Sequence, residues 1–96
     1  MKYALRAKVW LYKGSGAWHF ITIPKETSEK IQKKYKAKTR GWGSLKVRVS
    51  LGKSVWDTSI FPDTRSGTYL LPLKAAIRKK EEILEGETVS FSITLL

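Results

Sequence analysis

The side chains that could perform nucleophilic or acid–base chemistry are few in this chain. His19 is the single histidine, and it lies between two aromatic residues in a stretch typical of a β-strand. Ser15, Ser59 and Asp57 could act as its partners, but neither serine lies in a Gly-x-Ser-x-Gly elbow between a strand and a helix. We therefore interpret His19 as an ordinary sheet residue facing opposite its aromatic neighbours, and we expect no catalytic site.

Metal and phosphate sites also lack their usual patterns. One histidine and no cysteine cannot supply a zinc site. Gly52 and Lys53 resemble the end of a phosphate-binding loop, but the leading glycine position is Val47, and a strand follows where a helix is needed. A solvated turn accounts for the closely spaced carboxylates of Glu81, Glu82, Glu85 and Glu87. We expect no metal and no cofactor.

A more specific hypothesis concerns polar side chains around a short helix late in the chain. Lys74 and Arg78 are four residues apart, so they would share one face of that helix. If the helix covers a barrel mouth, both cations could meet strand hydroxyls over a small cavity that suits an anionic ligand. The alternative is that these groups only form hydrogen bonds joining helix to sheet. The predicted ligand-binding residues are Thr58, Ser59, Tyr69, Lys74 and Arg78.

A second hypothesis rests on basic charge. The chain has 19 lysine and arginine residues against 8 acidic ones, a formal net charge of +11. Such a charge favours nucleic acid or acidic partners, and cations beside an exposed aromatic ring can follow a phosphate backbone. The alternative is a solvated helix face beside a tryptophan in the core. The predicted nucleic-acid-binding residues are Lys30, Lys33, Lys34, Lys36, Lys38, Arg40, Trp42, Lys46 and Arg48.

Length and composition fit one globular domain. The chain has 96 residues, of which 42% are hydrophobic, enough for one modest core. The absence of cysteine fits a reducing cytoplasm, and no apolar stretch reaches the length of a membrane span. Asparagine is absent and Met1 is the single methionine, a depletion typical of thermophilic proteins. We expect a single cytoplasmic domain over residues 1–96, with no membrane contact and a thermophilic source.

Alternation of apolar and polar residues predicts six strands. A tight hairpin turn is expected at Gly52 and Lys53. Residues 62–67 are predicted to form a turn, and Pro72 to stop the strand before it. The predicted strands cover residues 3–12, 17–23, 45–51, 54–61, 68–71 and 88–95.

Two short helices are predicted between these strands. Pro24 ends the second strand and suits the first turn of a helix over residues 25–35. Ile31 and Tyr35 form only a narrow apolar stripe on it, so this helix should cover the core and not run through it. Residues 73–80 mark the second helix. Closing the strands into a barrel would remove exposed sheet edges, with one helix over each open end.

An ordered set of residues along nearly the whole chain carries a family resemblance, and its most specific part runs from Trp56 to Arg78. The set comprises Trp18, Pro24, Gly41-Trp42-Gly43, Val47, Val49, Gly52, Trp56-x-x-Ser59, Pro62, Tyr69-Leu70-Leu71-Pro72, Lys74, Arg78 and Gly86-Glu87. In this combination the chain resembles the "domain of unknown function nineteen-oh-five" family of small prokaryotic proteins.

The resemblance implies an all-β dominated fold: a six-stranded double-split β-barrel capped at each end by a short helix. The same barrel class includes transcription regulators in which two chains build one barrel, whereas one chain holds both halves here, so we expect a monomer. The family has no established activity, and the regulators' basic arms have no match in this chain. We predict a non-enzymatic binding or accessory module for an anionic ligand or partner, with sequence-tolerant nucleic-acid binding as the alternative.

Overall fold

The computed structural model describes residues 2–14, 16, 18–35 and 43–96. Within them the chain forms six strands and two helices, at the places that the sequence predicts. The helices are α1 (Lys25–Tyr35) and α2 (Ala75–Lys80). The strands are β1 (Lys2–Leu11), β2 (His19–Thr22), β3 (Leu45–Leu51), β4 (Ser54–Asp63), β5 (Thr68–Pro72) and β6 (Thr88–Leu95).

The strands close into a barrel in the order β1-β2-β5-β4-β3-β6, and all neighbouring pairs are antiparallel. The prediction of an all-β dominated, six-stranded barrel is therefore confirmed. Because the barrel is closed, each of the six described strands has a neighbour on both sides. This closure protects the sheet against pairing with other chains.

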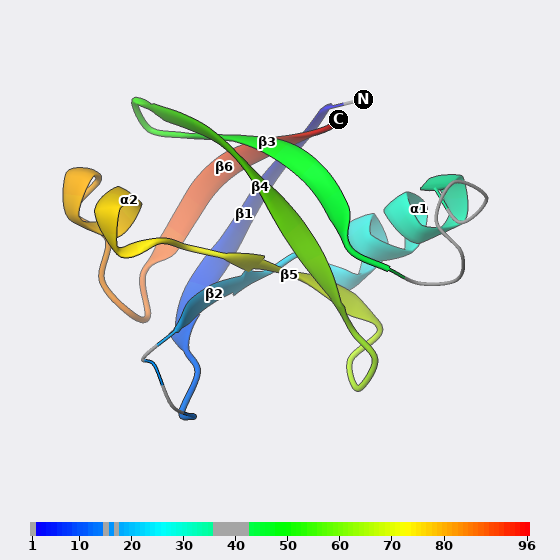
Figure 1. The fold of residues 1–96 in the computed structure, drawn as a ribbon, viewed down its shortest axis with the longest axis horizontal. Coiled ribbons are helices and arrows are strands. Elements are labelled where there is room, and N and C mark those ends of the chain that lie inside the picture. Colours follow the sequence, from blue (N-terminus) through cyan, green and yellow to red (C-terminus); the bar gives the residue numbers. More distant parts are fainter. Residues whose placement is uncertain (1, 15, 17, 36–42) are drawn as a thin grey trace.

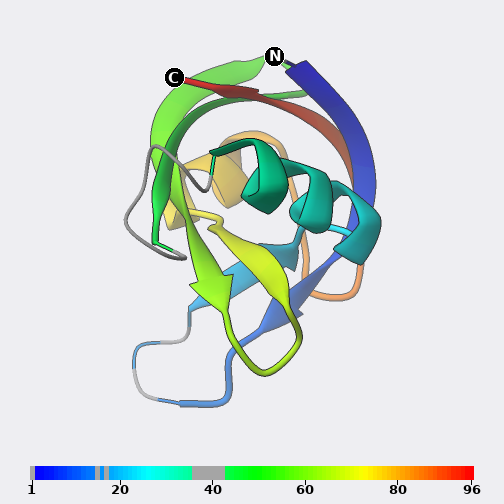
Figure 2. The ribbon, with the colours of Figure 1, turned by 90° about the vertical axis from the view of Figure 1, so that its right-hand side faces the viewer.

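The two longest strands, β1 and β4, change partners along their length. β1 pairs with β6 up to Lys8 and with β2 from Val9. β4 pairs with β3 up to Ile60 and with β5 from Phe61. We call β6, β3 and the adjoining parts of β1 and β4 (residues 2–8 and 54–60) the arch. We call β2, β5 and the remaining parts of β1 and β4 the short half (Figures 1 and 2).

The core lies inside the barrel and follows strand alternation. Successive side chains of a strand point to opposite faces, so alternate residues of each strand enter the core. Burying a large aliphatic side chain contributes about 1.5–3 kcal/mol. The buried apolar residues are Val9, Ile21, Ile23, Ile31, Leu45, Val47, Val49, Leu51, Ile60, Tyr69, Leu71, Leu73, Ile83, Phe91 and Ile93.

Helix α1 is fixed to the short half by one apolar residue and one buried hydroxyl. Ile31 is fully buried, and Tyr35 packs partly buried against the core, as the narrow stripe predicted. Ser28 Oγ donates to the carbonyl of Ile23 at 3.0 Å and accepts from the backbone N–H of Tyr69 at 3.0 Å. This hydroxyl therefore satisfies two backbone groups, one just after β2 and one in β5.

Helix α2 is held mainly by residues around it. None of its own residues is buried, although Ile77 packs partly buried against the core, and Ile83 beyond the helix is buried. Ser54 Oγ donates to Glu81 Oε2 at 2.6 Å, which ties the end of α2 to the start of β4. Glu81 is thus a structural partner, unlike the purely solvated turn that the sequence suggested. Neither described helix is long and apolar enough to cross a membrane.

Two prolines lie inside strands, in contrast to the predicted boundaries. The sequence placed Pro62 in a turn and Pro72 after a strand, but β4 extends through the first and β5 includes the second. Pro62 pairs with Tyr69 of β5. β4 pairs with β3 only as far as Ile60, so the missing N–H of Pro62 costs no hydrogen bond on that side.

Candidate functional site

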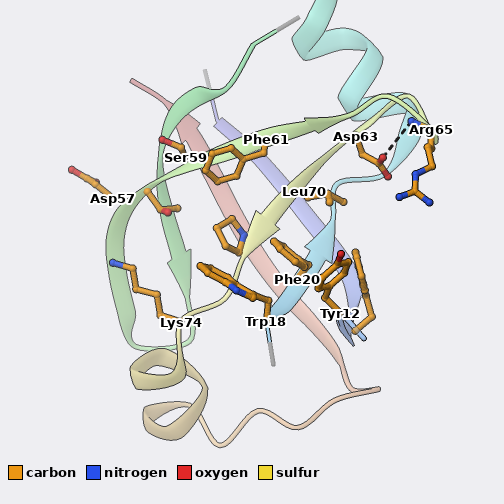
Figure 3. A pocket seen from close by; sticks show the side chains of 13 residues that line it. Tyr12, Trp18, Phe20, Asp57, Ser59, Phe61, Asp63, Arg65, Leu70 and Lys74 are labelled. Atoms are coloured by element: carbon orange, nitrogen blue, oxygen red, sulfur yellow. Dashed lines mark hydrogen bonds between the residues drawn. The ribbon is translucent and has the colours of Figure 1, made fainter. Parts of the chain in front are cut away.

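A groove of about 1100 Å³ runs over the outer wall of the short half and the adjoining part of β4. Figure 3 shows Lys74 and Asp57 at one end and Arg65 at the other, with Trp18 and Phe20 between them. The groove therefore lies on the outside of the barrel and not over its mouth, where the sequence hypothesis placed the site. Its lining is Trp10, Tyr12, Trp18, Phe20, Asp57, Thr58, Ser59, Phe61, Asp63, Arg65, Leu70, Pro72 and Lys74.

An aromatic cluster around Phe20 forms the floor of the groove. The Phe20 ring centroid lies 5.2 Å from that of Trp10 and 6.2 Å from that of Trp18, whose ring plane is only 12° from parallel. Tyr12 meets Phe20 edge-on, with centroids 6.4 Å apart. Such pairs contribute about 0.5–1.5 kcal/mol each beyond burial, so the floor is a preformed surface.

Strand register explains why these rings meet. Trp10 and Phe20 are direct partners in the β1–β2 pair. Trp18 lies two residues before Phe20, and residues two apart in an extended chain share a face. Trp10 Nε1 donates to Thr22 Oγ1 at 2.9 Å, which satisfies the indole N–H and fixes the orientation of its ring.

Aromatic side chains on both sides of the groove keep much of their surface in water. Trp18 is 55% exposed, Tyr12 48% and Phe61 46%. Phe61 comes from β4 and lies across the groove from Trp18 (Figure 3). Large apolar side chains gathered on a surface and rimmed by polar groups are typical of interaction sites. The groove therefore offers ring faces to a ligand from two directions.

The two carboxylates at the rim are already engaged within the protein. Asp57 accepts from Arg48 Nε at 2.7 Å and Nη2 at 3.1 Å. The hydrogen bonds from Arg48 lower the pKa of the Asp57 carboxyl below its ordinary value. Asp63 accepts from Ser66 Oγ at 2.8 Å and from the backbone N–H of Arg65 at 3.3 Å. Both aspartates thus serve to position their neighbours.

The cations at the rim are less constrained. Among the described residues, neither Lys74 nor the Arg65 guanidinium takes part in an ion pair. Lys74 is exposed and lies immediately before α2 in an extended conformation, with φ −62° and ψ 148°. The charge that this groove can offer to a ligand is therefore positive.

The structure brings three of the five predicted ligand-binding residues together and separates the other two from them. Thr58, Ser59 and Lys74 all line the groove. Tyr69 is only 2% exposed and belongs to the core, on the inner side of β5. Alternation along β5 from Leu71, which is also buried, explains this placement.

Arg78 also lies apart from the groove. Its Nε donates to the carbonyl of Leu73 at 3.2 Å, and its Nη1 lies 3.5 Å from His19 Nε2. It lines a separate hollow beside α2. Lys74 is the N-cap residue of α2, and its carbonyl accepts from the backbone N–H of Arg78 at 3.0 Å. The Arg78 guanidinium lies against Leu73 and His19, whereas Lys74 lines the groove.

The predicted nucleic-acid-binding set is spread over α1 and β3. Lys30 is on α1 with its Nζ 3.6 Å from Glu26 Oε1, and Lys33 and Lys34 follow it on the same helix. Lys46 and Arg48 are exposed on the outer face of β3. Lys36, Lys38, Arg40 and Trp42 lie outside the described residues.

The sequence reasoning missed the aromatic floor of the groove. Trp10 falls on the outer face of β1, and Phe61 alternates with buried Ile60 on β4. An aromatic residue in the polar register of a half-buried strand is the signal that could have found the groove. The remaining chemistry is sparse, since no group of three His, Asp or Glu side chains among the described residues could hold a metal ion.

Fold and surface together define a class: an all-β closed barrel of six antiparallel strands, with an aromatic groove on its outer wall. The chain belongs to the family described as "Domain of unknown function (DUF1905)", whose model matches residues 6–93. The family resemblance drawn from the ordered residues is thereby confirmed. A search of curated proteins finds no match. The function must therefore be argued from the surface itself.

Proposed function

We propose that this domain is a non-enzymatic binding module that takes an anionic ligand with a flat apolar portion in the groove. The observation that carries the proposal is an exposed lysine at the rim of an aromatic floor. Trp18 and Phe61 offer ring faces against which a flat group can pack. Lys74 offers an ammonium group that has no ion-pair partner among the described residues.

The neighbouring polar groups support an anion at the Lys74 end. Thr58 and Ser59 line the groove, and the Ser59 hydroxyl, on the same outer face of β4 as Phe61, can donate to carboxylate or phosphate oxygens. Arg78 holds the carbonyl of Leu73, so its role in the proposal changes from ligand contact to positioning the chain before Lys74. Tyr69 contributes to the core and not to the ligand.

The dimensions of the groove favour a ligand of nucleotide size or larger. Small-molecule sites typically enclose about 300–1,000 Å³ behind mainly apolar walls with a few placed polar groups. The groove, at about 1100 Å³, is slightly larger than that range. The cations at its two ends, Lys74 and Arg65, favour a ligand that extends along the groove.

The test is isothermal titration calorimetry with adenosine monophosphate, and with adenosine and inorganic phosphate as partial probes. We expect adenosine monophosphate to bind more tightly than either partial probe, because only it offers both ring and charge. Lys74→Gln should weaken its binding about tenfold, the loss of one charge-assisted contact, and leave adenosine unaffected. Trp18→Ala should weaken the binding of both adenosine monophosphate and adenosine.

The matched control is Lys53→Gln, which removes the same charge from the exposed turn between β3 and β4. It should leave every affinity unchanged. If adenosine monophosphate binds no better than phosphate, or if Lys53→Gln weakens it as much as Lys74→Gln, the groove does not recognise such a ligand.

Sequence-tolerant nucleic-acid binding through the Lys30–Arg48 region remains the alternative. The exposure of Lys46 and Arg48 on one strand supports it. Its test is a duplex titration of the Lys33→Glu, Lys34→Glu double variant, which should lose affinity if α1 is part of the contact.

We also propose finer features of the fold and the setting of this domain. The partner changes of β1 and β4 support the description of a double-split barrel, and helices on opposite sides in Figure 1 support one helix at each end. We infer a single cytoplasmic domain that acts as a monomer, from a thermophilic source.

A further inference from the structure

The outer face of the arch carries cations on two of its strands. Lys2, Arg6 and Lys8 project from β1, and Lys46 and Arg48 from β3; all are exposed. The strand between them is β6, which pairs with both. We call this surface, made of the outer residues of β1 (2–8), β6 and β3, the basic face. Figure 2 shows its three strands curving together over one side of the barrel.

The middle of the basic face is a row of short hydroxyl side chains. Thr94 lies directly between Lys2 of β1 and Arg48 of β3, and Ser90 lies opposite Arg6. Ser92 continues the row between them. Neighbouring strands are about 4.8 Å apart, so the two rows of cations stand about 10 Å apart across the hydroxyls. Long cationic side chains thus flank a lower strip of hydrogen-bond donors.

Little acidic charge balances this surface. Among the described residues, Arg48 is the one cation of the basic face in an ion pair, with Asp57. The remaining acidic residues lie on α1, at the end of β4 (Asp63), and in the segment from Glu81 to Glu87. None of the three strands carries an acidic residue, so the basic face holds a local excess of positive charge, which attracts polyanions.

We propose that the basic face binds duplex nucleic acid through its sugar–phosphate backbone, without reading the bases. Lysine, arginine, serine and threonine are the side chains that contact phosphate oxygens in protein–DNA complexes. Single strands are bound by stacking bases on aromatic rings, and the outer positions of β1 (2–8), β6 and β3 carry none. A duplex, whose bases are already stacked, needs only the charges and hydroxyls.

Other polyanionic partners fit the basic face less well. An anionic membrane is usually bound with apolar side chains inserted between the lipids, and a protein partner with aromatic or other large anchors at the centre of the interface. On the three strands, the outer positions between the cations hold Ala4 and hydroxyl residues, and exposed Leu96 lies only at the edge. This proposal does not depend on the groove, because Lys74 and the aromatic cluster lie on a different part of the surface.

The test is fluorescence anisotropy of short labelled DNA duplexes over a salt series. Two unrelated sequences should bind equally, and single strands more weakly. Four cations of the basic face have no ion-pair partner among the described residues. The logarithm of the affinity should therefore fall against that of salt with a slope of about −3 to −4, at about 0.9 per neutralised phosphate.

Charge variants separate the basic face from net charge alone. Arg6→Gln with Lys46→Gln removes one exposed cation from each side of β6, and should reduce the salt slope by about 2. Lys79→Gln with Lys80→Gln removes equal charge from exposed positions on α2, and should change neither slope nor affinity. Ser90→Asp, at an exposed position of the central row, should abolish binding without lowering the unfolding midpoint.

Three outcomes would overturn the proposal: no duplex binding at low salt, an equal loss in the α2 control, or tighter binding to phosphatidylserine vesicles than to duplexes. Lys74→Gln distinguishes the two proposals, because it should weaken the binding of adenosine monophosphate and leave the affinity for duplexes unchanged. Failure of one proposal therefore leaves the other standing.

Discussion

The outer walls of the arch and of the short half carry different chemistry over the same kind of core. On β1, Lys8 is the last outward residue of the arch and Trp10 the first of the short half. On β4, Ser59 precedes Ile60, where pairing with β3 ends, and Phe61 begins the pairing with β5. In both strands the outer side chains change from polar to aromatic where the strand changes partner.

The comparison shows that the core does not dictate the outer surface. Residues on the inner side of both halves are aliphatic and buried, as in Val49 of β3 and Leu71 of β5. Because side chains alternate, the outer positions are free to vary. The arch uses them for charge, which costs little in water, whereas the short half exposes aromatic rings. Exposed aromatic rings leave apolar surface in water, and a cluster of them is typical of an interaction site.

The largest expected effect comes from breaking the aromatic floor. Phe20→Ala removes the ring that contacts Trp10, Tyr12 and Trp18, and we expect a loss of about 2–4 kcal/mol in the free energy of unfolding, since Phe20 is only half-buried. Arg6→Ala on the basic face should change it by less than about 0.5 kcal/mol. Urea unfolding followed by circular dichroism measures both.

If Phe20→Ala lowers the free energy of unfolding by less than about 0.5 kcal/mol, as expected for Arg6→Ala, the distinction between the faces is contradicted. The aromatic cluster would then be a surface feature that adds nothing to the barrel, and its value as a preformed ligand surface would fall with it.

A smaller effect is expected from the hydroxyl that joins α1 to the short half. Ser28→Ala leaves the carbonyl of Ile23 and the N–H of Tyr69 without this partner, at a cost of about 1–3 kcal/mol. Hydrogen exchange should quicken more in β2 and β5 than in β6. Thr27→Ala, one residue earlier on the same helix, is the matched control and should have little effect. A uniform rise in exchange would mean that the two halves open together.

Much of the fold could be predicted because its signals are local. The alternation of residues 45–51 and 88–95 gave β3 and β6 with their bounds, since burial on one face imposes a period of two. Pro24 marked the start of α1. The predicted hairpin turn has Gly52 at φ +58°, a conformation that glycine adopts without strain.

Outward aromatic residues on single strands can be recognised in the sequence, but their assembly into one groove depends on the pairing of distant strands. Trp10 and Phe61 are far apart in sequence and line the same groove because only β2 and β5 separate their strands in the closed barrel. The sequence predicts the second helix from residue 73, whereas α2 begins at Ala75, with Lys74 in an extended conformation before it. Strand pairing and helix ends of this kind are set by tertiary packing, which local patterns do not contain.

The smallest expected effect concerns the ion pair that joins the two surfaces. Arg48 belongs to the basic face and Asp57 to the rim of the groove, and they are direct partners across β3 and β4. The hydrogen bond from Arg48 keeps the pKa of Asp57 below its ordinary value of 3.8. Arg48→Gln should raise this pKa back toward that value, as measured by NMR titration of the carboxyl carbon.

The sign of the pH dependence follows from the direction of that shift. A carboxyl with a lowered pKa in the folded state stabilises the fold above its unfolded pKa, and loses this contribution as pH falls through the folded value. Wild type should therefore lose slightly more stability than Arg48→Gln on acidification below about pH 4. The difference should be small because both side chains are exposed and screened by solvent. An unchanged Asp57 pKa in the variant would mean that the two surfaces are electrostatically independent.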